Sequence, residues 1–451
     1  MKSSAISFRI LATAGLLLLA TGVSGQNKEK YNIFSLDLHM MTRGEIRDGG
    51  VVKTEDDEVK DDNSSFVLGR ERLIVGYENL RLNKDSLSTK PWLQMSLNVQ
   101  HQGVWGQSGK GAFNVHEGWA KLSANNGLFT QVGRQVLAYD DERIIGPNDW
   151  SMAGISHDAL KLGYEGHGHK VHAILSYNQN AENMEGGTYY QNGAQPYKTM
   201  QTVWYHYDIP KIPLGASLLF MNIGMQGGDK GVDERTEWQQ LIGGYVKYSD
   251  KIWSLEGSYY RQMGHNEDGI KIKAWMASVK GQVSPSRYFG FEAGYDYLSG
   301  DEKFAVPGKG DIGLIRHDVI KGFNPIYGSH HNFYGAMDFF YVSTYVNGFT
   351  PGLQNAFVGG YAKPVKGLKI GVGYHYLAMS TKLIEMDKRL GHELELSASY
   401  QIIKEVNVSA GFSYMTGTKT MERLKRASND GNLKWGWISL NITPRIFSIK
   451  W

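Results

Sequence analysis

Arginine side chains are concentrated in the first third of the chain, at spacings that could place several of them on one surface. Arg70 and Arg72 lie two residues apart, so in a strand both side chains would project to the same side. A guanidinium keeps its charge and binds carboxylates with two parallel hydrogen bonds. A cluster of these groups would attract and guide an anionic solute. The six arginines of this group are Arg43, Arg47, Arg70, Arg72, Arg134 and Arg143.

Carboxylates close to the same arginines in the sequence allow a second interpretation. In this interpretation each arginine pairs with an acid and only stiffens the surrounding wall, and both interpretations can hold in one protein. The acids that we place with the arginines on a solute pathway are Glu117, Asp140, Asp141 and Glu142. Further possible partners are Asp37, Glu45, Glu71 and Glu78.

Other site chemistry has little support in the sequence. The chain contains no Cys, which excludes disulfides, thiolate metal sites and Cys nucleophiles. The stretch 106–111 resembles a phosphate loop, but it lacks the full spacing and the Ser or Thr after Lys110. No nucleophile elbow and no zinc-protease motif is present. We therefore expect no enzymatic activity, no cofactor and no nucleic-acid partner.

The segments that carry these residues have a hydrophobic period of two. Phe34, Leu36, Leu38 and Met40 occupy even positions, while polar residues occupy the odd ones. This alternation is typical of strands that separate an apolar from a polar environment. Similar segments recur to the end of the chain, among them Val67–Leu80, Trp92–Gln102, Leu128–Tyr139, Leu160–Glu165, His331–Val346 and Leu433–Thr443. We count about 18 strands, with 16 as the alternative.

The connections between these segments alternate between short and long. Ser123–Gly127 and Lys363–Gly367 are short, whereas Asp48–Ser65, Asp140–His157 and Glu302–Ser329 are long. Outer-membrane β-barrels have this pattern, and a barrel of 16 to 18 strands encloses an aqueous channel. A propeller is disfavoured because no repeat of blade length is present. We predict an all-β, antiparallel transmembrane barrel. Because an arginine facing lipid costs roughly 2–4 kcal/mol at mid-membrane, we expect the arginines to face the lumen.

Both ends of the chain fit this prediction. Residues 1–25 read as a cleaved signal peptide, with Lys2 and Arg9 before an apolar run at Ile10–Ala20. At about 11 residues this run is shorter than the ~20 that a spanning helix needs. Residues 26–451 then form one barrel domain, which ends on the aromatic Trp451. We expect Sec-dependent export to a Gram-negative outer membrane, and recognition of the last strand by the barrel assembly machinery. The barrel would stand in outer-membrane lipid as a monomer.

Two stretches resemble the alginate export family. The first is Gly133–Gly146, with its Gly-Arg-Gln start and Arg143, followed by Asp149 and Trp150. The second is Phe323–Gly328 with His331, Tyr334, Gly335 and Asp338. This resemblance implies an 18-stranded monomeric barrel with an electropositive, arginine-rich constriction. It also implies a solute pathway at Arg70, Arg72, Arg134 and Arg143, with Asp140, Asp141 and Glu142 as the acidic counterpart. The type member exports an acidic polysaccharide, although alginate is not implied for every member.

Three functions follow as hypotheses. The first is a passive outer-membrane channel for an anionic polysaccharide or a small organic anion. The second is a general or substrate-specific diffusion porin without anion preference, in which the arginines are neutralised. The third is a structural or adhesive barrel whose long loops carry the binding function.

Overall fold

The computed structural model describes most of the chain after the predicted signal peptide. The described residues are 30–49, 63–81, 91–107, 111–180, 187–191, 193, 195–302, 319–338, 340, 350–383, 386–425 and 432–451. The predicted signal peptide, residues 1–25, lies outside them. No helix within these ranges has the length and hydropathy needed to cross a membrane.

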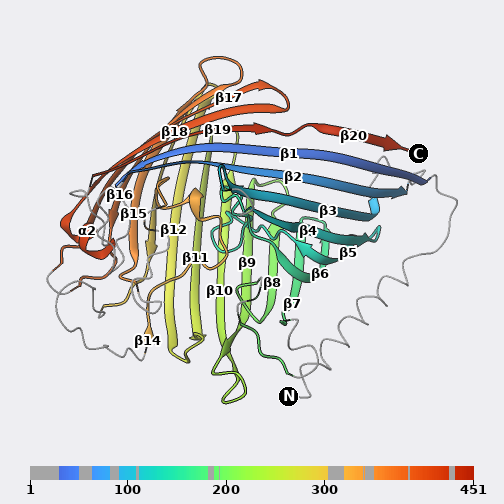
Figure 1. The fold of residues 1–451 in the computed structure, drawn as a ribbon, viewed down its shortest axis with the longest axis horizontal. Coiled ribbons are helices and arrows are strands. Elements are labelled where there is room, and N and C mark those ends of the chain that lie inside the picture. Colours follow the sequence, from blue (N-terminus) through green and yellow to red (C-terminus); the bar gives the residue numbers. More distant parts are fainter. Residues whose placement is uncertain are drawn as a thin grey trace.

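The described residues fold into one sheet of long strands, with one short α-helix among them, α2 (Lys419–Lys425), near the end of the chain (Figure 1). The first strands are β1 (Lys30–Asp48), β2 (Asn63–Arg81), β3 (Pro91–Val104), β4 (Ala112–Ser123), β5 (Leu128–Gln135), β6 (His157–Gly166), β7 (His169–Tyr177), β8 (Thr199–Asp208), β9 (Leu214–Gly227) and β10 (Arg235–Ser249). The others are β11 (Trp253–His265), β12 (Lys271–Ser286), β13 (Phe289–Leu298), β14 (Val319–Ile320), β15 (Leu353–Ala362), β16 (Leu368–Ala378), β17 (Arg389–Ile403), β18 (Val406–Gly417), β19 (Asn432–Ile442) and β20 (Arg445–Lys450).

The sheet closes on itself because β1 pairs with the last strands as well as with β2. Met40 is opposite Ile442 of β19, and Ile33 is opposite Lys450 of β20, so β19 and β20 form one interrupted stave. β14 is a two-residue strand that pairs in parallel with β12 and adds no stave. The result is a closed antiparallel barrel of 18 strands, which confirms the predicted fold class. In Figure 1, β1 to β3 run across β10 to β12, as tilted staves on opposite walls do.

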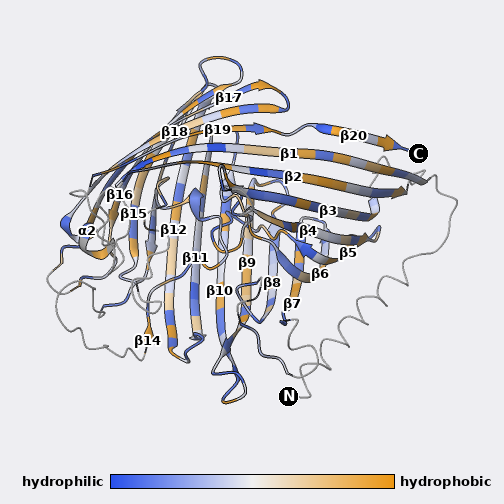
Figure 2. Cartoon of the chain, in the orientation of Figure 1, coloured by the Kyte–Doolittle hydropathy of each residue, from blue (hydrophilic) through white to orange (hydrophobic). Residues whose placement is uncertain are grey.

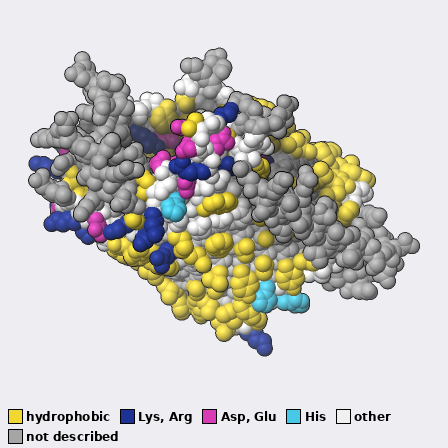
Figure 3. All heavy atoms as spheres, turned by 90° about the horizontal axis from the view of Figure 1, so that it is seen from below, with side chains coloured by type: hydrophobic (Ala, Val, Ile, Leu, Met, Phe, Trp, Pro, Cys, Tyr) yellow, Lys and Arg dark blue, Asp and Glu magenta, His cyan; other side chains and the backbone are white. Residues whose placement is uncertain are grey.

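Side chains alternate between the lipid side and the lumen along each stave, and hydrophobic and hydrophilic residues alternate in Figure 2. Leu97 and Leu396 project outward with 46% and 49% of their surface exposed. Their neighbours Asn98 and Glu395 point into the barrel, where Asn98 is buried. Hydrophobic side chains cover much of the outer surface, with Lys and Arg at its margins (Figure 3). This is the pattern that period two predicts for a barrel in lipid.

The two ends of the barrel differ in their connections. At one end the strands are joined by short turns, such as 167–168 and 363–367; we call it the turn end. The other, the loop end, carries the longer connections, including 136–156 and the chain between β13 and β15. Both chain termini of the barrel, at β1 and β20, lie at the turn end (Figure 1).

Two of the longer connections enter the barrel. The first inserted segment, residues 136–156, and the second, residues 321–338, pair with each other through a bridge between Ile145 and Tyr327. Their apolar residues pack against inward side chains of the wall, such as Met221 and Tyr260, which are almost fully buried. The hydrophobic core of this protein therefore lies inside the barrel, between the inserted segments and the wall. It follows β7 to β11 and continues near the loop end of β12 to β19.

The second inserted segment corrects one sequence prediction. His331–Val346 was predicted to be a strand, but its described residues contain only a single 3-10 turn, His330–Asn332, and irregular backbone. Tyr334, Gly335 and Asp338 have positive φ, which an extended strand does not allow. The barrel closes with 18 staves without this segment.

Substitutions at two neighbouring positions should test the inside and outside assignments. We expect Leu396→Arg to lower the free energy of unfolding by about 2–4 kcal/mol, because it places a guanidinium in lipid. Residue 397 faces the lumen cavity, so Ser397→Arg puts no charge in lipid. It should lower the free energy of unfolding by less than ~1 kcal/mol. Chemical denaturation in lipid vesicles measures both. Equal losses in the two variants would contradict the assignment of faces.

Candidate functional site

The carboxylate of Asp149, in the first inserted segment, binds two arginines of the wall. Arg70 Nη1 donates to Asp149 Oδ1 at 3.0 Å and Arg72 Nη1 to the same oxygen at 2.7 Å. Both guanidinium side chains are nearly inaccessible, at 5% and 7% exposure, whereas Asp149 is half exposed. Arg72 also donates to Gln100 of β3 at 2.6 Å. These contacts hold residues 147–155 against β1 to β3.

A second contact of this kind lies beside the first. Arg43 donates to Glu45 Oε1 at 2.9 Å and to the carbonyl of Trp150 at 2.9 Å. Its guanidinium lies 3.8 Å from the centre of the Trp150 ring, and the ring of His331 stacks on the same indole at 3.8 Å. Cation–π and stacking contacts thus join the wall, the first inserted segment and the second. Arg47 also binds Glu45, at 2.9 Å, but its side chain is 41% exposed.

Arg143 is the buried centre of the contact between the two inserted segments and the wall. It binds Asp296 of β13 at 3.0 Å and Asp141 at 3.1 Å. It also donates to Tyr334 Oη at 3.0 Å. Burial alone would lower the pKa of Arg143, but the carboxylates of Asp296 and Asp141 outweigh it and raise the pKa well above its ordinary value. This arginine is therefore a permanently charged anchor.

The other predicted acids also hold the inserted segments in place. Glu117 accepts a hydrogen bond from the amide of Val136, where the first inserted segment begins. Glu142 accepts from the Ser329 hydroxyl at 3.0 Å and so links the two segments. Asp140 accepts from the Trp204 indole at 3.1 Å, and burial raises its pKa.

Arg134 lies on the other face of the wall from the one expected. Its register partners are Gly118 and Asp158, and Gly118 is in turn opposite the outward Leu97. The guanidinium forms a bidentate salt bridge with Asp158 near the loop end, with N–O distances of 2.8 and 2.7 Å. An opposing carboxylate on the next strand offsets the cost of the outward charge. Arg134 therefore does not join the other five arginines inside the barrel.

An open cavity of about 590 Å³ lies inside the barrel on the other side of the inserted segments, against β12 to β19. The wall there carries small inward residues, so the cavity reaches from the second inserted segment toward the turn end. These small residues include Gly290, Gly371, Gly373, Ser397, Gly411 and Ser413. The lumen is thus divided into a packed part and an open part.

Lysines, which the sequence reasoning passed over, face the lumen nearer the turn end. Lys280 and Lys369 line the cavity, and Lys280 binds Glu256 at 2.5 Å. Lys161 shares an inward row with Gln131 and Lys121. Within the described ranges Lys121, Lys161 and Lys369 form no ion pair with a carboxylate. Their alternation with apolar neighbours, such as Lys161 between Leu160 and Leu162, is the sequence signal that identifies them.

The acidic partners were harder to find in the sequence than the arginines. Of the acids that bind the six arginines, only Glu45 and Asp141 had been predicted, whereas Asp149, Asp158 and Asp296 had not. None of the described residues forms a group of three or more His, Asp or Glu side chains that could hold a metal ion.

The fold of this barrel has counterparts among solved structures. The chain is similar to OccK9 (OpdG) of Pseudomonas aeruginosa, with 12% identity, a TM-score of 0.58, and coverage of 92% of this chain and 98% of that one. OccAB1 of Acinetobacter baumannii has 12% identity, a TM-score of 0.59, and coverage of 92% and 97%. The outer membrane protein OpdK of Pseudomonas aeruginosa has 10% identity, a TM-score of 0.55, and coverage of 94% and 99%. No protein-family model and no curated protein matches the sequence. At such identities the likeness concerns the fold.

The Asp149 contact leads to a prediction about the first inserted segment. Asp149→Asn would leave Arg70 and Arg72 close together and without their shared carboxylate, so we expect residues 147–155 to loosen. Amide hydrogen exchange at Gly154 and Ile155 should accelerate at least about tenfold, which corresponds to ~1.4 kcal/mol.

Asp158→Asn is the matched control, because its arginine partner is Arg134 on the outer face. This control should leave exchange at Gly154 and Ile155 unchanged. Unchanged exchange in Asp149→Asn, or equal acceleration in both variants, would show that the carboxylate does not hold the segment.

Proposed function

We propose that this protein is a passive outer-membrane channel for small polar solutes, with a preference for organic anions or an anionic glycan. The observation that carries the proposal is the open, polar cavity beside β12 to β19. Closed barrels of this size enclose aqueous channels. The likeness of the fold to an outer membrane protein supports the same location.

Several finer elements belong to this proposal. The signal peptide would direct Sec-dependent export, and the last strand would be recognised by the barrel assembly machinery. The barrel would stand in the membrane as a monomer, with its loop end outside the cell. Membership of the alginate export family is part of the proposal and rests on the Gly133–Gly146 stretch, Asp149 and Trp150.

The support for anion preference comes mainly from lysines. Arg43, Arg70, Arg72 and Arg143 are buried and bound to carboxylates, so they leave little field for a passing solute. The lysines nearer the turn end are better placed to act on it, and Lys161 and Lys369 have no carboxylate partner among the described residues. A lumen lined with uncompensated positive charge raises the local concentration of anions.

A diffusion porin without anion preference is the second candidate. Glu292 and Glu395 line the same cavity as Lys369. Glu292 accepts a hydrogen bond from Gln282 and forms no ion pair with any described residue. These acids could balance the lysines. The ion selectivity of the purified protein distinguishes the two candidates.

Lysine removal should weaken the selectivity if the proposal is right. A unit charge about 7 Å from an ion in water contributes ~0.6 kcal/mol, which is close to the thermal energy. We therefore expect Lys161→Gln with Lys369→Gln to lower the anion-to-cation permeability ratio at least about threefold. Reversal potentials in planar bilayers under a salt gradient measure this ratio.

The charge-keeping variant Lys161→Arg with Lys369→Arg is the control and should keep the ratio of the unmodified protein. A cation-selective or unselective unmodified channel would exclude the anion preference and leave the diffusion porin. Absence of any conductance would contradict the channel itself.

A further inference from the structure

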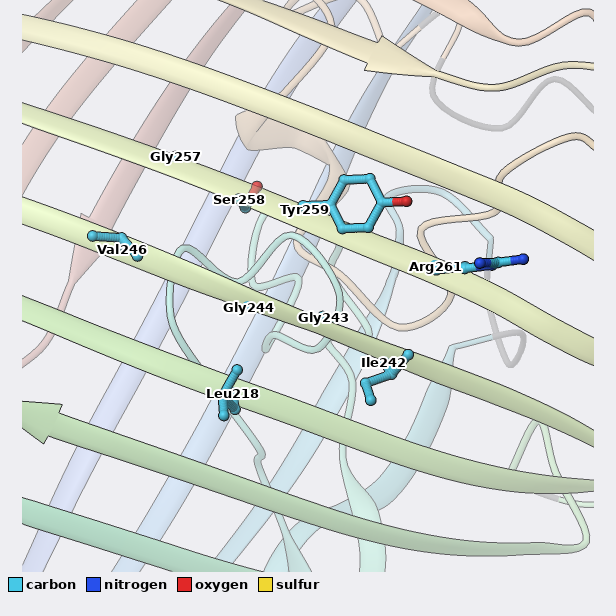
Figure 4. Close-up of a pocket in the computed structure, with 9 residues that line it drawn as sticks. All are labelled: Leu218, Ile242, Gly243, Gly244, Val246, Gly257, Ser258, Tyr259 and Arg261. Atoms are coloured by element: carbon cyan, nitrogen blue, oxygen red, sulfur yellow. The ribbon is translucent and has the colours of Figure 1, made fainter.

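The outer wall of the barrel carries a groove of about 660 Å³ that opens to the lipid side (Figure 4). Leu218 of β9, Ile242 and Val246 of β10, and Tyr259 of β11 project around it. In Figure 4 Val246 lies toward one end of the groove and Arg261 of β11 lies at the other. The groove is thus lined mainly by apolar side chains and has a charged side chain at one end only.

The groove exists because glycines interrupt the outward-facing rows of side chains. Gly244 stands in register between Leu218 and Tyr259, and Gly257 is opposite Val246. Without side chains at these two positions, the surface is hollowed between its large neighbours. A Cβ at Gly257 would meet no atom closer than the Ser278 oxygen, at 3.4 Å, so the backbone there has room for a side chain. The hollow therefore exists because residue 257 is a glycine, and a larger residue at this position would fill it.

The charged end of the groove has no acidic partner among the residues that the structure describes. Arg261 is opposite Ile242 on one side and Trp275 on the other, and all three lie on the outward face. Lys273 is exposed on that face of β12, two residues from Trp275 toward the loop end. Within the described ranges neither Arg261 nor Lys273 forms an ion pair. Arg134, also on the outward face, is by contrast bound by Asp158.

Aromatic residues place Arg261 at the level of lipid headgroups. Trp275 stacks on Tyr259 and on Tyr297, with ring centroids 6.1 and 4.8 Å apart. Girdles of exposed aromatic side chains mark the two membrane interfaces of outer-membrane barrels. Trp253, also exposed, lies at the turn end of the same strand as Arg261. The groove accordingly extends from the loop-side headgroup level into the hydrocarbon.

We propose that this groove is a binding site for a phosphate-bearing lipid of the loop-side leaflet. One acyl chain lies in the groove between Leu218 and Tyr259, and a phosphate lies on Arg261 and Lys273. Guanidinium and phosphate match geometrically through two parallel hydrogen bonds. An uncompensated pair of cations at the headgroup level is complementary to an anionic lipid. The site lies outside the lumen, so it is independent of the proposed channel function.

Binding of a bis-phosphorylated lipid A to the delipidated full-length barrel in detergent tests this proposal. Native mass spectrometry gives the occupancy and the apparent Kd, and a diacylglycerol of matched chain length serves as the uncharged probe. We expect Arg261→Gln with Lys273→Gln to weaken lipid A binding at least about tenfold. Gly257→Leu fills the groove from outside and should weaken both lipids.

Lys251→Gln with Arg287→Gln is the control for charge, because it removes two cations from exposed turns at the other end of the barrel. Equal loss of lipid A binding in this control, or unchanged binding in both groove variants, would overturn the proposal. So would a dimer that disappears in Gly257→Leu, since a second copy of the chain would then occupy the groove. Bilayer conductance should be unchanged in all three variants, which separates failure of this site from failure of the channel.

Discussion

In the hydrocarbon core of a membrane no water can hydrogen-bond the backbone, so a sheet that spans it must have no open edge. In this protein β1 meets that constraint by pairing with β2 on one side and with β19 and β20 on the other. Closure then sets the direction of every side chain, because alternate residues must face lipid or lumen. The inserted segments and the outer groove are both consequences of that division.

Inside the closed wall, the inserted segments divide the lumen unequally. Asp149 and Arg143 tie them to opposite parts of the wall, through Arg70 and Arg72 on one side and Asp296 on the other. The apolar residues of the segments fill the lumen beside β7 to β11 and near the loop end of the other strands, whereas small residues keep it open nearer the turn end beside β12 to β19. The arginines thus fix the position of the segments. In the proposed channel a solute would meet the residues that line the open part. A charge that is fully paired specifies where a segment lies better than it attracts a solute.

The fold could be predicted from the sequence because alternation is a local signal that each strand repeats. The inward direction of Arg70 and Arg72 followed from the same signal. Arg134 was assigned to the wrong face because the cost of a charge in lipid was judged without Asp158, a partner that only the register of β5 and β6 brings beside it. His331–Val346 was taken for a strand because its positive-φ residues and its contacts to Glu393 and Glu395 have no signature in periodicity. Long-range partners of inserted segments are set by the closed barrel, which local patterns do not describe.

The central claim, that solute passes along the small-residue side of the lumen, can be tested because the chain has no Cys. Ser397→Cys introduces one thiol into the open cavity, and Ala274→Cys places one in the packed core near the loop end of β12, where Ala274 is 1% exposed. The most direct measurement is the rate at which a charged, membrane-impermeant methanethiosulfonate reagent modifies each thiol and changes the current of the reconstituted channel. We predict rapid modification and partial block for Ser397→Cys and no modification for Ala274→Cys. Rapid block through Ala274→Cys with an unreactive Ser397→Cys would contradict the account.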